Sequence, residues 1–147
     1  MLDSRGGRFA NELGTRDYLS NKTLEAEPET RTVTIVLNEG AAKDAPKHVP
    51  LYSGKGLLQR FEALGDLAAW MGVSEARLRA TFHEYEEHAR AGTDPFGKAT
   101  FNNAVWGREG PLYAGRVTPV LHYTMGGLRV SEKGEVLTAG GAPIAGL

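Results

Sequence analysis

The sequence predicts an α+β fold in which helices pack on a small mixed or antiparallel sheet. Three observations predict it. Residues 31–37 are rich in β-branched side chains, as buried strands are. Apolar residues recur at intervals of three and four between residues 57 and 89, which is typical of amphipathic helices. Short apolar runs separated by glycine-containing turns follow residue 117 and predict a β-meander.

Composition indicates an ordinary soluble domain. The 147 residues carry 17 basic and 18 acidic side chains, interspersed, so no charge bias favours nucleic acid or an anionic membrane. The absence of cysteine excludes disulfides, thiolate zinc sites and a catalytic thiol. No apolar run approaches the ~20 residues of a membrane span. The compartment is not specified, and cytoplasmic and organellar locations both stay open.

The first fifty residues predict two short helices around a strand. Residues 6–9 are typical of a tight turn, and Thr15 or Asp17 is a candidate cap for a helix that starts near Tyr18 and ends at Pro28. A strand follows at 31–37. Asn38 then offers an N-cap for a second helix with Glu39 in its first turn; Pro46 and Pro50 are expected to cut this helix short and leave a loop.

Two longer amphipathic helices follow. We expect the first over residues 57–71, with Gly65 as a candidate break and Gly72 as its stop. The second is capped by Ser74 and ends at Gly92. Its expected apolar face is formed by Leu78, Phe82, Tyr85 and Ala89.

The rest of the chain predicts a loop and then short strands. Residues 93–111 are rich in glycine, proline and asparagine, so we expect a loop anchored by its isolated aromatic residues Phe96, Phe101 and Trp106. Residues 117–121, 127–130 and 136–138 are expected to be strands.

Three apparent motifs favour structural interpretations. His83 and His88 are five residues apart, whereas two metal ligands on one helical face need a spacing of four. Residues 54–59 begin like a dinucleotide-binding turn but have glutamine where the third glycine is required, so a loop glycine pair before a helix is favoured. His48 has no partner visible in the sequence. No metal site is predicted.

Two segments carry a resemblance to a known family. They are GRFANELGTRD at residues 7–17 and HYTMGG at residues 122–127, in that order and about a hundred residues apart. Together they resemble segments of the flavin-dependent fumarate reductases and their succinate dehydrogenase relatives. The resemblance continues through residues 35–39, 52–56 and 94–97, is greatest to the soluble fungal and protozoan branch, and covers nearly the whole chain.

The resemblance implies roles for three residues. Arg16 matches the arginine that donates a proton to the substrate in that family. His122 matches the histidine that binds a substrate carboxylate. Tyr123 matches a position that contacts the flavin. Fumarate would be reduced to succinate by a hydride from the flavin and a proton from the arginine. A fixed guanidinium suits a dianion, but its ordinary pKa of about 12.5 makes it a weak acid that needs a proton relay.

The same resemblance implies that this is a piece of an FAD-dependent oxidoreductase. Residues 1–116 would be part of a substrate-capping domain, and residues 117–147 strands that return to the FAD-binding domain. We expect the chain to lack the family's glycine-rich dinucleotide segment, its Thr-Glu-x-x-Arg relay and an Asn-Arg-Leu-Gly-Gly-Asn segment. The isolated chain is therefore expected to be inactive and to associate with itself through an exposed sheet edge.

Alternatives remain from the residues themselves. Arg16 also suits an ion pair with Asp17 or Glu12 at a helix start, and His122 also suits a packed position in a strand. The intact protein would otherwise act on another unsaturated acid, such as urocanate or an acrylate derivative, or on aspartate. A non-catalytic, truncated binding or interaction domain is a further alternative. The electron donor, the direction in vivo and the oligomeric state are not specified.

Overall fold

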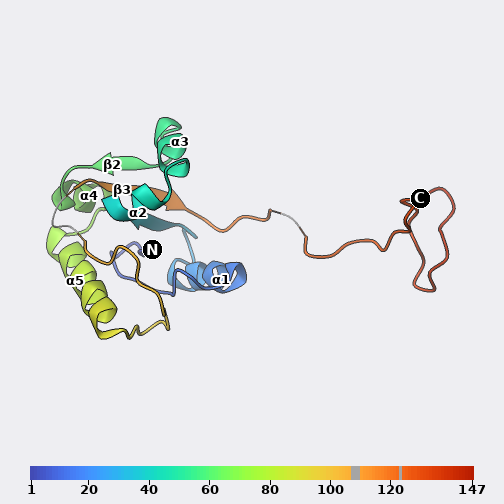
Figure 1. The fold of residues 1–147 in the computed structure, drawn as a ribbon, viewed down its shortest axis with the longest axis horizontal. Coiled ribbons are helices and arrows are strands. Elements are labelled where there is room, and N and C mark those ends of the chain that lie inside the picture. The colour runs from blue at the N-terminus through green and yellow to red at the C-terminus, as the bar shows by residue number, and fades with distance from the viewer. Residues whose placement is uncertain (107–109, 123) are drawn as a thin grey trace.

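The computed structural model describes residues 1–106, 110–122 and 124–147 (Figure 1). Helices and a small antiparallel sheet make up the described part, which confirms the predicted fold class. In chain order the elements are α1 Arg16–Ala26, β1 Val33–Leu37, α2 Glu39–Asp44, α3 His48–Gly54, β2 Gln59–Phe61, α4 Leu64–Met71, α5 Glu75–Ala91 and β3 Leu112–Val117.

The sheet has three antiparallel strands in the order β1-β3-β2. The central strand, β3, is the last of the three in the sequence, and it pairs Gly115 with Ile35 on one side and Ala114 with Gln59 on the other. Leu2 forms a bridge with Thr34 on β1. This bridge lays the first residues along the edge of β1 that β3 does not occupy.

The hydrophobic core lies between the sheet and helices α4 and α5. Leu67 on α4 and Leu78 on α5 are both 0% exposed. The other buried members come from the three strands, the same two helices and the N-terminal segment, so each layer contributes to the same cluster. They are Leu2, Val36, Phe61, Leu64, Ala68, Phe82, Leu112 and Ala114.

Helix α5 matches its sequence prediction closely. The Ser74 hydroxyl accepts a hydrogen bond from the Arg77 backbone N–H at 3.2 Å, and Gly92 ends the helix with a φ of 67°. The predicted apolar face is buried except at Ala89, which is partly exposed. Gly72 ends α4 in the same way, with a φ of 77°.

The predictions for the first fifty residues hold with one exception. Helix α1 follows Thr15, and the Asn38 side chain accepts from the Ala41 backbone N–H at 2.9 Å to cap α2. The expected loop after Pro46 is wrong, because α3 forms there and contains Pro50. Pro50 lies in the first turn, where backbone N–H groups have no partner within the helix, so its missing N–H costs no hydrogen bond.

The predicted helix over residues 57–71 is wrong in its first part. Residues 59–61 form β2 instead, and α4 begins at Leu64. Pairing with β3 outweighs the helical spacing in this short stretch, and it buries Phe61 while Leu57 stays 60% exposed. The loop prediction for residues 93–111 is confirmed in the described part. Its anchors include Phe101, whose ring centroid is 5.5 Å from that of Tyr85, and Trp106, 4.9 Å from Phe82.

The chain after β3 runs away from the helices and the sheet as an extended segment (Figure 1). Strand β3 ends at Val117, where the predicted strand 117–121 was to begin, so that prediction is wrong. The strands predicted at residues 127–130 and 136–138 are reduced to isolated β-bridges. Val130 pairs with Val136, and Leu137 pairs with Pro143. Such short ribbons lack the additional strands that stable sheets require. Across the described ranges, no helix is long and apolar enough to cross a membrane.

Candidate functional site

A tight turn joins the first residues to α5. The buried carboxylate of Asp3 accepts hydrogen bonds from the backbone N–H groups of Gly7 at 2.8 Å and Arg5 at 3.0 Å. Gly6 has a φ of 74°, and its carbonyl accepts from the Thr81 hydroxyl at 2.7 Å. A Cβ at Gly6 would lie 3.0 Å from the buried Leu78. Glycine is therefore favoured here by both the backbone and the packing.

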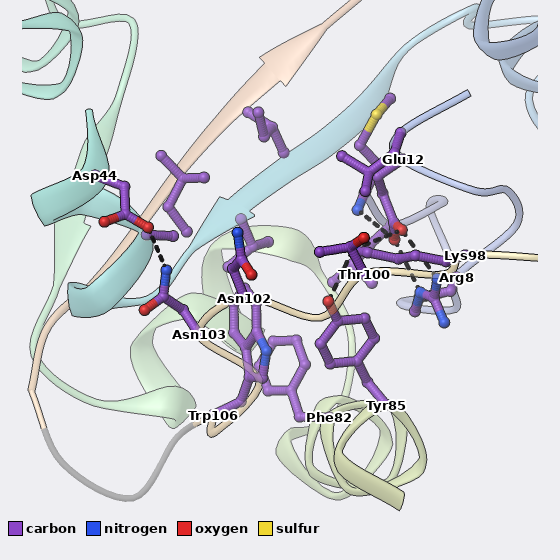
Figure 2. Close-up of a pocket in the computed structure, with 17 residues that line it drawn as sticks. Arg8, Glu12, Asp44, Phe82, Tyr85, Lys98, Thr100, Asn102, Asn103 and Trp106 are labelled. Atoms are coloured by element: carbon purple, nitrogen blue, oxygen red, sulfur yellow. Dashed lines mark hydrogen bonds and ion pairs between the residues drawn. The ribbon is translucent and has the colours of Figure 1, made fainter. Parts of the chain in front are cut away.

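The Arg8 guanidinium joins two distant carboxylates (Figure 2). Its Nε and Nη2 atoms donate to the two carboxylate oxygens of Glu12 at 2.8 and 2.9 Å, which is a two-point interaction. Nη1 donates to Asp94, whose side chain is 0% exposed. Asp94 also accepts from the backbone N–H groups of Phe96 and Lys98, each at 3.1 Å. Arg8 therefore fixes the loop after α5 to the N-terminal segment.

Lys98 completes a cluster of two positive and two negative side chains, and the Met1 amino group also donates to Glu12, at 3.2 Å. Its ammonium donates to Glu12 at 3.3 Å and to the Tyr85 hydroxyl at 2.8 Å. Burial acts to raise the pKa of Glu12, but the hydrogen bonds from Arg8 and the positive charges of the Met1 amino group and Arg8 outweigh it and lower the pKa to about 2. The pKa of Asp94 is also lowered, since the hydrogen bond from Arg8 outweighs burial there. Both carboxylates stay ionised at neutral pH.

A cavity of about 340 Å³ lies beside this cluster, between β1, α5 and the loop that follows α5 (Figure 2). Arg8, Glu12 and Lys98 form one end, and Asp44 and Asn103 form the other, joined by a 2.6 Å hydrogen bond. The walls between are mainly apolar. Its volume is that of a small-ligand site. Neither Arg16 nor His122 lines it.

Arg16 is the first residue of α1, and its side chain is exposed. His122 lies in the extended segment after β3 and is also exposed. The two predicted substrate residues therefore lie at the surface, one on the helical body and one on the segment that leaves it (Figure 1). Tyr123, the predicted flavin contact, lies outside the described residues.

The three motifs interpreted as structural lie in different elements of the fold. His83 pairs with Glu87 at 3.7 Å on the exposed side of α5, and the described residues hold no group of three metal-ligating side chains. Gly54 ends α3 and Gly56 lies in the loop after it, but this loop leads into β2 rather than the predicted helix. His48 begins α3, with its ring centroid 6.2 Å from that of Tyr52.

The sequence prediction missed the charged cluster. Arg8 and Glu12 are four residues apart and opposite in charge, which is a weak signal because the segment is not helical. Nothing in the sequence pattern pairs Arg8 with Asp94, since 86 residues separate them.

Comparison with known proteins decides the family. The family described as "FAD binding domain" matches residues 1–147, the whole chain. The chain belongs to this family. Within it, the fumarate reductase of Schizosaccharomyces pombe is 35% identical over 148 residues, covering 100% of this chain and 28% of that protein. The urocanate reductase of Eggerthella lenta is 29% identical over 153 residues, covering 99% of the chain and 25% of that protein.

A solved structure agrees with the sequence relatives. The open conformation of a flavocytochrome c3 fumarate reductase matches with a TM-score of 0.77 and 31% identity, covering 99% of this chain and 25% of that one. The chain thus spans about a quarter of the length of these relatives. The resemblance to fumarate reductases drawn from two short segments is confirmed, and FAD is the cofactor that this family indicates.

The described elements do not form a cradle for the phosphates of FAD. Such a cradle is a glycine-rich turn between a strand and a helix, with the phosphates at the helix N-terminus. The described strand-to-helix connections are Asn38, between β1 and α2, and residues 62–63, between β2 and α4. They contain no glycine, and an acidic residue lies in or directly after each.

Proposed function

We propose that this chain forms part of an FAD-dependent oxidoreductase that reduces fumarate to succinate. Residues 1–116 belong to its substrate-capping domain, and residues 117–147 return to the domain that holds the flavin. The observation that carries the proposal is the 35% identity with a fumarate reductase over the full length of the chain. The exposed, extended course of the segment after β3 supports the proposed division near residue 117.

Arg16 and His122 bind the substrate in this proposal. Fumarate carries a carboxylate at each end, so two groups from separate parts of the fold can hold it in one orientation. Arg16 offers a planar, charged donor at the first turn of α1, where the helix dipole also favours an anion. Its guanidinium donates the proton, while His122 hydrogen-bonds the second carboxylate. Tyr123 contacts the flavin, which supplies the hydride when bound.

A second candidate is reduction of a different unsaturated acid. The 29% identity with a urocanate reductase over 99% of the chain favours this alternative. Both substrates carry a carboxylate next to a carbon–carbon double bond, so Arg16 would have the same role. A competition assay with the two acids distinguishes them.

The sharpest test replaces the aligned quarter of the Schizosaccharomyces pombe fumarate reductase with this chain. Activity is measured as fumarate-dependent oxidation of a reduced viologen dye. We expect Arg16→Gln to lower kcat about 100-fold or more, as removal of a proton donor does, and His122→Ala to raise KM mainly. The matched controls are Arg79→Gln and His83→Ala, two exposed residues of α5. Retained activity in Arg16→Gln would refute the proposed role.

A simpler experiment uses the purified 147-residue chain with added FAD. A colourless, inactive protein is the expected result, because the described elements form no phosphate cradle. A stable flavin spectrum with turnover would show that the chain alone is sufficient.

A further inference from the structure

We propose that Asn11 is the residue that positions Arg16. This inference rests on the proposed function, because it takes Arg16 to be the proton donor. The geometry that supports it does not depend on that role.

Asn11 makes four hydrogen bonds, two through its backbone and two through its side chain. Its carbonyl accepts from the Gly14 N–H at 3.0 Å, and its own N–H donates to the Tyr18 hydroxyl at 3.3 Å. Its side-chain oxygen accepts from the Leu13 N–H at 2.9 Å. Its side-chain nitrogen donates to the Gly97 carbonyl at 3.2 Å.

Arg16 lies midway between two of these partners. Gly14 precedes it by two residues, and Tyr18 follows it by two. The Tyr18 ring also lies against the turn, since a Cβ at Gly14 would be 2.3 Å from the Tyr18 Cδ1 atom. Asn11 is therefore bonded directly to the backbone before Arg16, at Gly14, and to the backbone after it through the side chain of Tyr18. A side chain that must present one hydrogen in one direction gains from such a fixed backbone.

Asn11 is itself tied to the rest of the fold. The next residue, Glu12, accepts two hydrogen bonds from the Arg8 guanidinium, and Arg8 also donates to Asp94. Gly97, which accepts from the Asn11 side chain, lies three residues after Asp94. The loop after α5 thus contacts this segment twice, once through the charged cluster and once through Asn11. Displacement of that loop would be transmitted to the first turn of α1.

Three variants separate the contacts of Asn11. Asn11→Ala removes the hydrogen bonds to Leu13 and Gly97. Asn11→Asp retains an acceptor for the Leu13 N–H and loses only the donor to Gly97. Tyr18→Phe removes the hydroxyl that accepts from the Asn11 N–H but keeps the ring against Gly14. The matched control is Asn102→Ala, an exposed asparagine in the loop after α5.

The first experiment measures hydrogen exchange by NMR in the full 147-residue chain, without flavin. The reporter is the Leu19 N–H, which donates to the Thr15 carbonyl at 2.9 Å across Arg16. We expect its exchange to accelerate about tenfold in Asn11→Ala and in Tyr18→Phe, and less in Asn11→Asp. Amides in the middle of α5 should not change. Unchanged exchange at Leu19 in both variants would overturn the proposal whether or not the chain takes part in catalysis.

The second experiment measures kinetics in the chimeric fumarate reductase described above. Asn11→Ala should lower kcat about tenfold with little change in KM, and Asn11→Asp should restore part of the loss. Arg16→Gln in the same protein tests the proposed function separately. If Arg16→Gln is fully active, the proton-donor role fails, and the exchange result alone decides on the positioning of Arg16. If Arg16→Gln is inactive and Asn11→Ala is unaffected, the positioning role is refuted.

Discussion

Arg8 donates a hydrogen bond to Asp94 although 86 residues separate the two in the sequence. The Asp94 side chain is 0% exposed and that of Arg8 is 9% exposed, so this is a buried ion pair. It connects the segment that leads to Arg16 with the loop that follows α5. The contact thus holds the loop after α5 against the segment that precedes α1.

Removal of Asp94 should destabilise the protein strongly. Asp94→Ala leaves part of the Arg8 charge uncompensated and frees the N–H groups of Phe96 and Lys98. We expect a loss of about 3 kcal/mol in the free energy of unfolding, measured by urea denaturation. The control is Glu87→Ala, whose carboxylate is exposed on α5 and should cost under about 0.5 kcal/mol. Equal effects of the two substitutions would contradict the buried ion pair.

Stability should fall on acidification below pH 4.5. The folded-state pKa of Glu12 is about 2, lower than its ordinary value of 4.5, so the unfolded state takes up the proton first as the pH falls. The stabilisation is fully present above pH 4.5 and is lost as the pH falls towards 2. Urea denaturation at several pH values in this range measures it. Glu12→Gln should be less stable at pH 7 and should lose less between pH 4.5 and 2; an identical pH dependence in both proteins would exclude Glu12 as the cause.

Two glycines with nearly the same φ should differ in their response to alanine. Gly6 has a φ of 74° and Gly72 a φ of 77°, so a side chain strains the backbone at both by about 1 kcal/mol. Only at Gly6 does the new Cβ meet a neighbour, 3.0 Å away on Leu78, whereas the space around Gly72 is open. Gly6→Ala should therefore cost at least about 1 kcal/mol more than Gly72→Ala, as judged by thermal unfolding. Similar losses would show that Leu78 moves aside without cost.

The segment after β3 should cause the isolated chain to self-associate. Leu121, Met125 and Leu128 are 106%, 92% and 75% exposed, and such a run of apolar side chains on an extended backbone favours contact with a second copy. Sedimentation velocity should show association that increases with protein concentration. A variant with all three residues changed to serine should sediment as a monomer. If the unchanged chain is also monomeric over the same concentrations, the exposed segment does not drive association.

The elements that could be predicted from the sequence have local signals. Ser74 and Gly92 each determine one end of α5 through contacts with residues nearby in the chain, and Asn38 does the same for α2. Capping depends on residue types at fixed short spacings, so it is visible without the structure.

The elements that could not be predicted depend on distant partners. β2 exists because residues 59–61 pair with β3, and the apolar spacing of residues 57–71 does not reveal that partner. The contact between Arg8 and Asp94 is hidden for the same reason. The candidate roles of Arg16, His122 and Tyr123 came from family resemblance, and they stay predictions until the variants are measured.

The position of β3 has a consequence for synthesis of the protein. A ribosome makes β1 and β2 first, yet these two strands are not neighbours, and each pairs with β3. Until residues 112–117 emerge, β1 and β2 both lack the strand with which they pair in the sheet, and only Leu2 bridges β1, at Thr34. Sheet formation therefore waits for the last strand and must close long loops when it arrives. A pause in translation before residues 112–117 would prolong the interval in which β1 and β2 lack β3. During that interval they can bind chaperones or aggregate.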